Sequence, residues 1–174
     1  MLGVRHLEVI PARGEEQPHP ELTPDALVRE LSRAKAAEVA GRYAGPEDAV
    51  IGADTVVALD GAVLGKPKST EDAARMLRSL SGRDHTVYTG ITVLRGNTAL
   101  SHTEATRVWF RPLEDGEIAR YIATGEPMDK AGAYGAQGYA SLFVERLEGD
   151  FFNVMGLPLC ALGKLLKQMD VTLL

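Results

Sequence analysis

The chain has 174 residues, of which 45% are hydrophobic and 25% charged, so it suits one domain or two small lobes that share a sheet. Its net charge of −5, with no basic tail or stripe, argues against a nucleic-acid polymer as the main partner, although a nucleotide needs only a few local cations. Without an apolar run of ~20 residues or a signal-peptide pattern, we expect a cytoplasmic protein that is not held in a membrane.

The first quarter of the chain predicts a strand, a loop and a helix. Residues 4–10 have a strand pattern, and residues 11–20 form a loop rich in proline and acid. Thr23 can cap a helix that continues to about Arg42. Within this helix Lys35 lies one or two turns from apolar residues on the same side. It either leans on this apolar seam or extends over the surface as an ordinary lysine.

The next segment places a carboxylate in an apolar strand. Residues 50–59 are a continuous apolar run, typical of a buried strand, that carries Asp54 in its middle. A buried carboxylate normally ionises only beside a cation, a metal ion or hydrogen-bond donors. After the hairpin signal Asp60-Gly61, the loop 65–68 brings Lys66. A strand acid that faces a loop lysine suits the handling of phosphate and a metal ion.

The remaining elements alternate between helices and strands. Helices are predicted over 69–82, where Ser69 can cap the first turn, over 114–124 and over 157–169. Strands are predicted over 85–94 and 99–111, on either side of a turn at 95–98, and over 141–147. The last helix is apolar on most of its surface, so we expect it to be buried, with Cys160 as a small core residue. This lone cysteine excludes an internal disulfide. The order indicates an α/β fold with a mixed sheet.

Four polar clusters lie in or beside these apolar segments: Asp54-Thr55, the loop 65–68, Glu15-Glu16 and the loop 126–138. Carboxylates hold a divalent cation and take a proton from water, lysines balance phosphate charge, and a glutamine amide can read a base edge. Each cluster also has a simpler interpretation. In the same order, these are a strand acid paired with an arginine, a segment that leads into a helix, a solvated acidic loop and a plain turn. Together they indicate a phosphate-handling α/β enzyme.

At these residues the chain resembles the Maf family of nucleoside triphosphate pyrophosphatases, the septum formation proteins. The resemblance covers nearly the whole chain and rests on four ordered blocks, which are 51–57 with 65–67, 80–90, 121–138 and 153–158. It implies an elongated α/β fold with a mixed sheet and two lobes around a central cleft. It also implies hydrolysis between the α and β phosphates of a nucleoside triphosphate, with Mg²⁺ or Mn²⁺, and a homodimer.

The resemblance further assigns roles to residues of this chain. Asp54 matches the family's proton acceptor, while Lys66, Lys35 and Glu16 match its loop lysine, helix lysine and early acid. Asp54 and Glu16 are the metal ligands that it implies. The substrate-binding positions are Thr55, Gln137 and Lys130. A threonine after the aspartate resembles the branch that acts on dTTP and UTP, whereas the branch that prefers 7-methyl-GTP carries a different residue there.

One family feature has no counterpart in the sequence. Family members begin with a strand and a serine-proline-arginine-arginine loop that grips the triphosphate, so we expect residues 1–174 to be a single Maf-like domain without that segment. Two hypotheses follow. The protein is a metal-dependent dTTP/UTP pyrophosphatase, which also acts on modified nucleotides in one variant of this hypothesis, or it is a nucleotide-binding or division-regulating module with little turnover.

Overall fold

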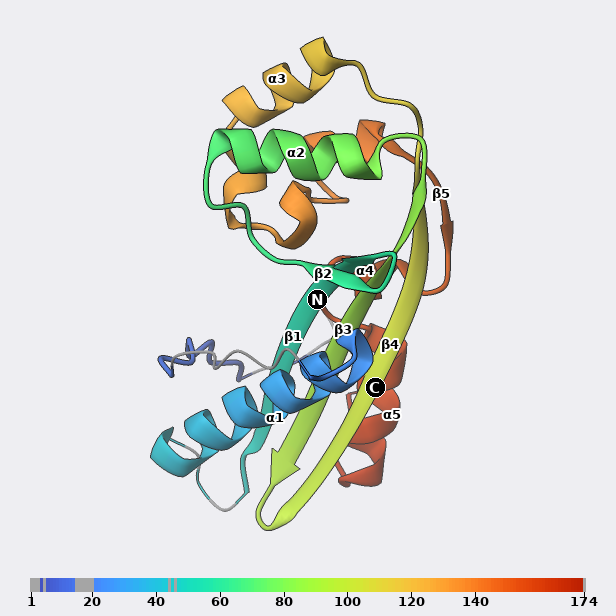
Figure 1. Ribbon diagram of the computed structural model, residues 1–174. Coiled ribbons are helices and arrows are strands. Elements are labelled where there is room, and N and C mark those ends of the chain that lie inside the picture. The colour runs from blue at the N-terminus through green and yellow to red at the C-terminus, as the bar shows by residue number, and fades with distance from the viewer. Residues whose placement is uncertain (1–3, 5, 15–20, 44, 46, 174) are drawn as a thin grey trace.

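A five-stranded sheet in the order β2-β1-β3-β4-β5 runs the length of the computed structural model (Figure 1). The structure describes residues 4, 6–14, 21–43, 45 and 47–173. The strands are β1 (Ala49–Leu59), β2 (Ala62–Leu64), β3 (Asp84–Arg95), β4 (Thr98–Phe110) and β5 (Val144–Glu148). The predicted α/β class, with a long sheet and flanking helices, is confirmed.

The sheet is antiparallel at every pairing among the described residues, and the expectation of a mixed sheet was wrong in this respect. Tight turns at 60–61 and 96–97 join β1 to β2 and β3 to β4, and two-residue turns connect antiparallel strands only. From β2 the chain passes through α2 (Thr70–Leu80) and enters β3 in the direction opposite to β1. The sequence signals for both hairpins were therefore correct, but the antiparallel sheet that such hairpins imply was not inferred from them.

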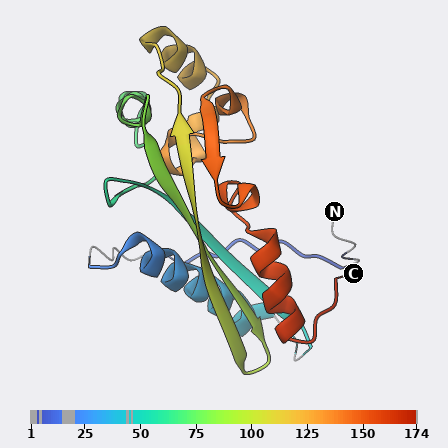
Figure 2. The ribbon, with the colours of Figure 1, turned by 90° about the vertical axis from the view of Figure 1, so that its right-hand side faces the viewer.

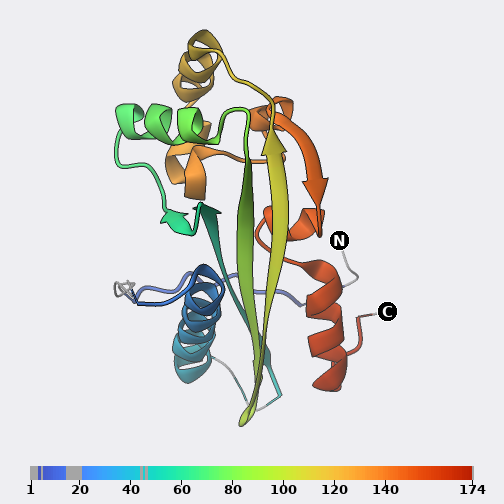
Figure 3. The ribbon, with the colours of Figure 1, turned by 45° about the vertical axis from the view of Figure 1, so that its right-hand side comes forward.

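Two helices cover opposite faces of one half of the sheet (Figures 2 and 3). Helix α1 (Pro24–Tyr43) packs on β1 and β3, while α5 (Leu159–Gln168) packs on the other face. Gly52 and Gly90 let α1 approach closely, because a Cβ atom built there lies 2.3 Å from the carbonyl oxygen of Ser32 and 2.1 Å from that of Val28. These two close approaches place α1 directly over the middle of β1 and β3.

The apolar side chains of α5 form one stripe rather than covering the helix. Ala161, Leu162, Leu165 and Leu166 are buried against Ile91 and Val93 of β3, whereas Cys160 is exposed. The expectation that Cys160 is a core residue was therefore wrong, because it occupies the solvent side of a helix that is buried along one face only.

The other half of the sheet carries a second hydrophobic core. Helices α2 and α3 (Asp115–Ala123) lie at this end with the 3-10 turns η1 (Glu126–Asp129), η2 (Ala131–Ala133) and η3 (Tyr139–Leu142), as Figure 1 shows. Ser69 caps α2 as predicted, since its hydroxyl accepts from the Asp72 amide at 3.2 Å. Leu77, Leu80, Val108 and Phe110 are among the buried residues of this core. Two cores joined by continuous strands account for the two lobes.

The strand predicted over residues 4–10 is not present among the described residues of that segment. Leu7 is 73% exposed and Val9 is 83% exposed, so these apolar side chains do not pack on a sheet. The chain then reaches α1, where the amides of Arg13 and Gly14 each donate to the Glu38 carboxylate at 3.0 Å. An extended segment without a sheet neighbour gains no ladder of hydrogen bonds.

Of the helices in the described part of the chain, none combines the length and apolar character that crossing a bilayer requires.

Candidate active site

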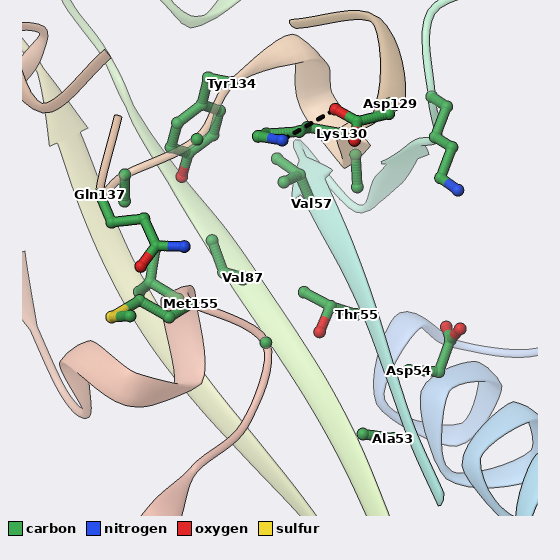
Figure 4. A pocket seen from close by; sticks show the side chains of 16 residues that line it. Ala53, Asp54, Thr55, Val57, Val87, Asp129, Lys130, Tyr134, Gln137 and Met155 are labelled. Carbon is green, nitrogen blue, oxygen red and sulfur yellow. Dashed lines mark hydrogen bonds and ion pairs between the residues drawn. The ribbon is translucent and has the colours of Figure 1, made fainter. Parts of the chain in front are cut away.

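A cavity of about 370 Å³ opens between β1 and the loop that follows α3 (Figure 4). Apart from Val87 of β3, its lining comes from four separate segments of the sequence. These segments are the middle of β1, the loop after β2, residues 129–137, and the turn that follows α4 (Phe151–Val154). Five predicted site residues share this lining: Asp54, Thr55, Lys66, Lys130 and Gln137.

Asp54 is held as an ion pair on the α1 side of β1. The Lys35 ammonium contacts Oδ1 of Asp54, and the Asp54 side chain is only 11% exposed. A cation beside a nearly buried carboxylate offsets the cost of removing its charge from water. Lys35 therefore contacts Asp54 rather than extending over the surface as an ordinary lysine. It also replaces the arginine that the simpler interpretation of Asp54 had required.

Thr55 points to the opposite side of β1, as Figure 4 shows, because successive side chains of a strand alternate. Its hydroxyl lies 2.8 Å from that of Thr89 on β3. Gln137 and Met155 line the same side of the cavity, where Val87 and Tyr134 supply an apolar wall. A flat heterocycle suits such a wall, since the surface is apolar with a few polar groups at its margin.

Lys66 lies in the loop between β2 and α2, and a backbone contact fixes this loop against η2. The amide of Gly132 donates to the carbonyl oxygen of Gly65 at 3.0 Å. On the cavity side, Lys130 forms an ion pair with Asp129 at 2.8 Å. The hydrogen bond from Lys130, together with the field of Lys66, lowers the pKa of the Asp129 carboxyl. Two lysines thus lie beside one ionised aspartate at the mouth of the cavity.

The loop after α3 takes its shape from Tyr121 and Glu126. The Tyr121 hydroxyl donates to Oε1 of Glu126 at 2.9 Å and accepts from the Gly135 amide at 3.2 Å. Oε2 of Glu126 accepts from the amide of Tyr139 at 3.0 Å. Lys130 packs across Gly135, where a Cβ atom would lie 2.8 Å from the lysine side chain. This segment is therefore more than a plain turn, because it places Lys130 and Gln137 on the cavity.

The part of the chain that the structure describes contains no group of three or more His, Cys, Asp or Glu side chains able to hold a metal ion. Two carboxylates, Asp54 and Asp129, line the cavity, and Glu16 lies outside the described residues. Mg²⁺ commonly uses one or two carboxylates together with substrate phosphates and water. The described residues therefore offer two carboxylates to a metal ion, which fits partial coordination of Mg²⁺ and not a cage made of protein ligands alone.

Sequence reasoning found the charged residues of the cavity but missed its buried polar support. Thr89 and Asn153 fall within the matched blocks 80–90 and 153–158, yet neither residue was selected as functional. Both side chains are fully buried. A threonine within a β-strand carries no signal of its own, because β-branched residues are common there.

Comparison with known proteins identifies the family of this chain. The family model described as Maf-like protein matches residues 1–169 of this chain. The chain belongs to the Maf-like protein family. A Geobacillus protein named dTTP/UTP pyrophosphatase is 52% identical, over 87% of this chain and 81% of its own length. Relatives of the same name from Pelotomaculum thermopropionicum and Methanosarcina mazei are 51% and 46% identical, over 95% and 94% of this chain and 87% and 83% of their own lengths.

Proposed function

We propose that this protein is a hydrolase that cleaves dTTP and UTP between the α and β phosphates, releasing the nucleoside monophosphate and pyrophosphate. The observation that carries this proposal is the meeting of the Lys35–Asp54 pair, Lys66 and Lys130 at one cavity with an apolar wall. The names of relatives that are about half identical over most of this chain support the same substrate class.

The proposed roles follow from charge and position. Asp54 accepts a proton from the attacking water, and Lys35 keeps this carboxylate ionised and oriented. Lys66 and Lys130 neutralise charge that spreads over the phosphate oxygens as the bond breaks. Thr55 and Gln137 face the base on the other side of the cavity. The strand therefore separates the hydrolytic group from the group that selects the base.

A divalent cation, Mg²⁺ or Mn²⁺, belongs to this proposal as the Lewis acid that polarises a phosphoryl oxygen. Asp54 is the described residue that would hold it, with Glu16 as the second predicted ligand outside the described residues. A homodimer and a cytoplasmic location stay predictions from the sequence.

The decisive experiment compares Asp54→Asn with the unchanged protein, using dTTP and UTP with Mg²⁺. We expect pyrophosphate and the nucleoside monophosphate as the only products, and a loss of about 100-fold or more in kcat for the variant, since general-base catalysis contributes about 10²–10⁴. Asp60→Asn is the matched control, because Asp60 lies in the exposed turn directly after the same strand and pairs with Arg83.

This experiment tests the proposed reaction and the role of Asp54 separately. Absence of pyrophosphate release by the unchanged protein would refute the function. Release of orthophosphate with a nucleoside diphosphate would show that a different phosphate bond is cleaved. Full activity in Asp54→Asn would refute only the role of Asp54.

A further inference from the structure

A chain of hydrogen bonds runs from the cavity into the protein interior. The hydroxyl oxygens of Thr55 and Thr89 are 2.8 Å apart, and the Thr89 hydroxyl lies 2.9 Å from the carbonyl oxygen of Asn153. Thr55 lines the cavity, whereas Thr89 is fully buried. The relay thus begins at a group that a ligand can touch and ends at a backbone carbonyl.

The direction of the relay is fixed by its buried end. A carbonyl oxygen can only accept, so the single hydroxyl proton of Thr89 lies between Thr89 and Asn153. Two oxygens 2.9 Å apart with no proton between them would repel each other. The Thr89 oxygen is then left to accept the proton of Thr55. With its proton engaged, Thr55 presents only lone pairs to the cavity.

The carbonyl that sets this direction is itself immobilised. The Asn153 side-chain amide donates to the Val87 carbonyl oxygen at 3.0 Å and to the Thr106 hydroxyl at 2.9 Å. Asn153 has no exposed surface, so its backbone cannot turn away to release Thr89. At the open end, a Cβ atom added to Gly156 would lie 3.5 Å from the Thr55 hydroxyl oxygen. Glycine there leaves the face of the hydroxyl clear.

We propose that Thr89 is a positioning residue that makes Thr55 a hydrogen-bond acceptor, and that Thr55 thereby selects the imide N3–H of thymine and uracil. This inference rests on the proposed function and names how its site discriminates between pyrimidines. Cytosine carries a lone pair at N3, which would face the lone pairs of Thr55. Gln137 on the same cavity can donate its amide to a neighbouring base carbonyl.

The test measures kcat/KM for UTP and CTP in Thr89→Val, Thr89→Ser and the unchanged protein. Valine cannot accept the Thr55 proton, so Thr55 becomes free to donate to cytosine N3. We expect the UTP-to-CTP ratio to fall about fivefold or more, the size of one net hydrogen bond. Serine restores the relay and should restore the ratio. Thr92→Val is the control, since Thr92 is an equally buried threonine of β3 that bonds Ser32 and Ser101 on the α1 side.

A purely structural role for Thr89 would lower both activities and leave their ratio unchanged, and that result would overturn the inference. Equal use of UTP and CTP by the unchanged protein would also overturn it. If Thr89→Val does not fold, Thr55→Val removes the acceptor directly and should reduce the ratio. Should no triphosphate be hydrolysed, the proposed function fails, and calorimetry with UMP and CMP still tests the relay. Equal affinities, or no binding of either, would refute it.

Discussion

A close approach between α1 and the sheet at Gly52 makes Gly52→Ala a sharp test of how the site is built. The added methyl carbon would lie 2.3 Å from the Ser32 carbonyl oxygen and 2.8 Å from the Ala36 amide nitrogen, both backbone atoms of α1. Ordinary contacts of this kind need about 3.5 Å, so the helix must retreat by about 1 Å. Lys35 lies between these two residues in α1 and must move with them.

Two effects of different size should follow. Overpacking of this kind costs about 1–3 kcal/mol, which lowers the melting temperature by roughly 3–10 °C in a chain of this length. Separating Lys35 from Asp54 by about 1 Å should reduce kcat/KM by up to about 100-fold, because misplacement on that scale has such an effect on catalytic groups. Activity therefore falls far more than the fraction of folded protein at 25 °C.

Thermal melts and steady-state kinetics with UTP measure both quantities on the same samples. Gly41→Ala is the control, because Gly41 lies in the same helix and its added Cβ atom meets nothing within 4 Å. It should gain up to about 1 kcal/mol from helix propensity and keep full activity. A Gly52→Ala protein with lower stability but unchanged kcat/KM would show that the position of Lys35 over Asp54 has no catalytic consequence.

Two further predictions concern buried groups near the cavity. Tyr121→Phe leaves the Gly135 amide without its acceptor and Oε1 of Glu126 without the Tyr121 donor, so urea unfolding should show a loss of about 1–3 kcal/mol. The KM for UTP should also rise, and an unchanged KM would contradict the role of the loop. Burial lowers the pKa of His85 to about 4, so the folded protein keeps it neutral while the unfolded chain binds a proton below about pH 6.5. The free energy of unfolding that depends on neutral His85 is therefore fully present above about pH 6.5 and is lost as pH falls toward 4. In urea titrations, His85→Phe should reduce the difference in unfolding free energy between pH 7 and pH 5 by about 2 kcal/mol. Equal pH dependence of stability in both proteins would refute the assignment.

Local signals in the sequence predicted local structure well. The turn at Asp60-Gly61, the cap at Ser69 and the start of α1 at Pro24 all depend on neighbours within a few residues, and each lies where it was expected. The strand expected over residues 4–10 failed for the opposite reason. A strand exists only with a neighbour that pairs with it, and the sequence of one segment contains no information about that neighbour.

The site shows the same division between local and distant information. Asp54 was selected as a candidate site residue because a charge in an apolar run needs a partner. The cost of burying that charge alone indicated that a partner exists. That the partner is Lys35 depends on how α1 crosses the sheet, which Gly52 and Gly90 determine through their missing side chains. Thr89 has no signal at all until its neighbours Thr55 and Asn153 are placed in space.

The alternation along β1 has a consequence for how this chain tolerates change. Asp54 and Thr55 are adjacent in sequence but lie on opposite faces of one strand, and under the proposed function they serve different parts of a nucleotide. A substitution at either position can alter one property while the other is preserved, so preference for a base and capacity for hydrolysis are separately adjustable. Removing a single residue from β1 before Asp54 would exchange the two faces and abolish both properties at once. This strand can therefore accept single substitutions, whereas an insertion or deletion that changes its length is not tolerated.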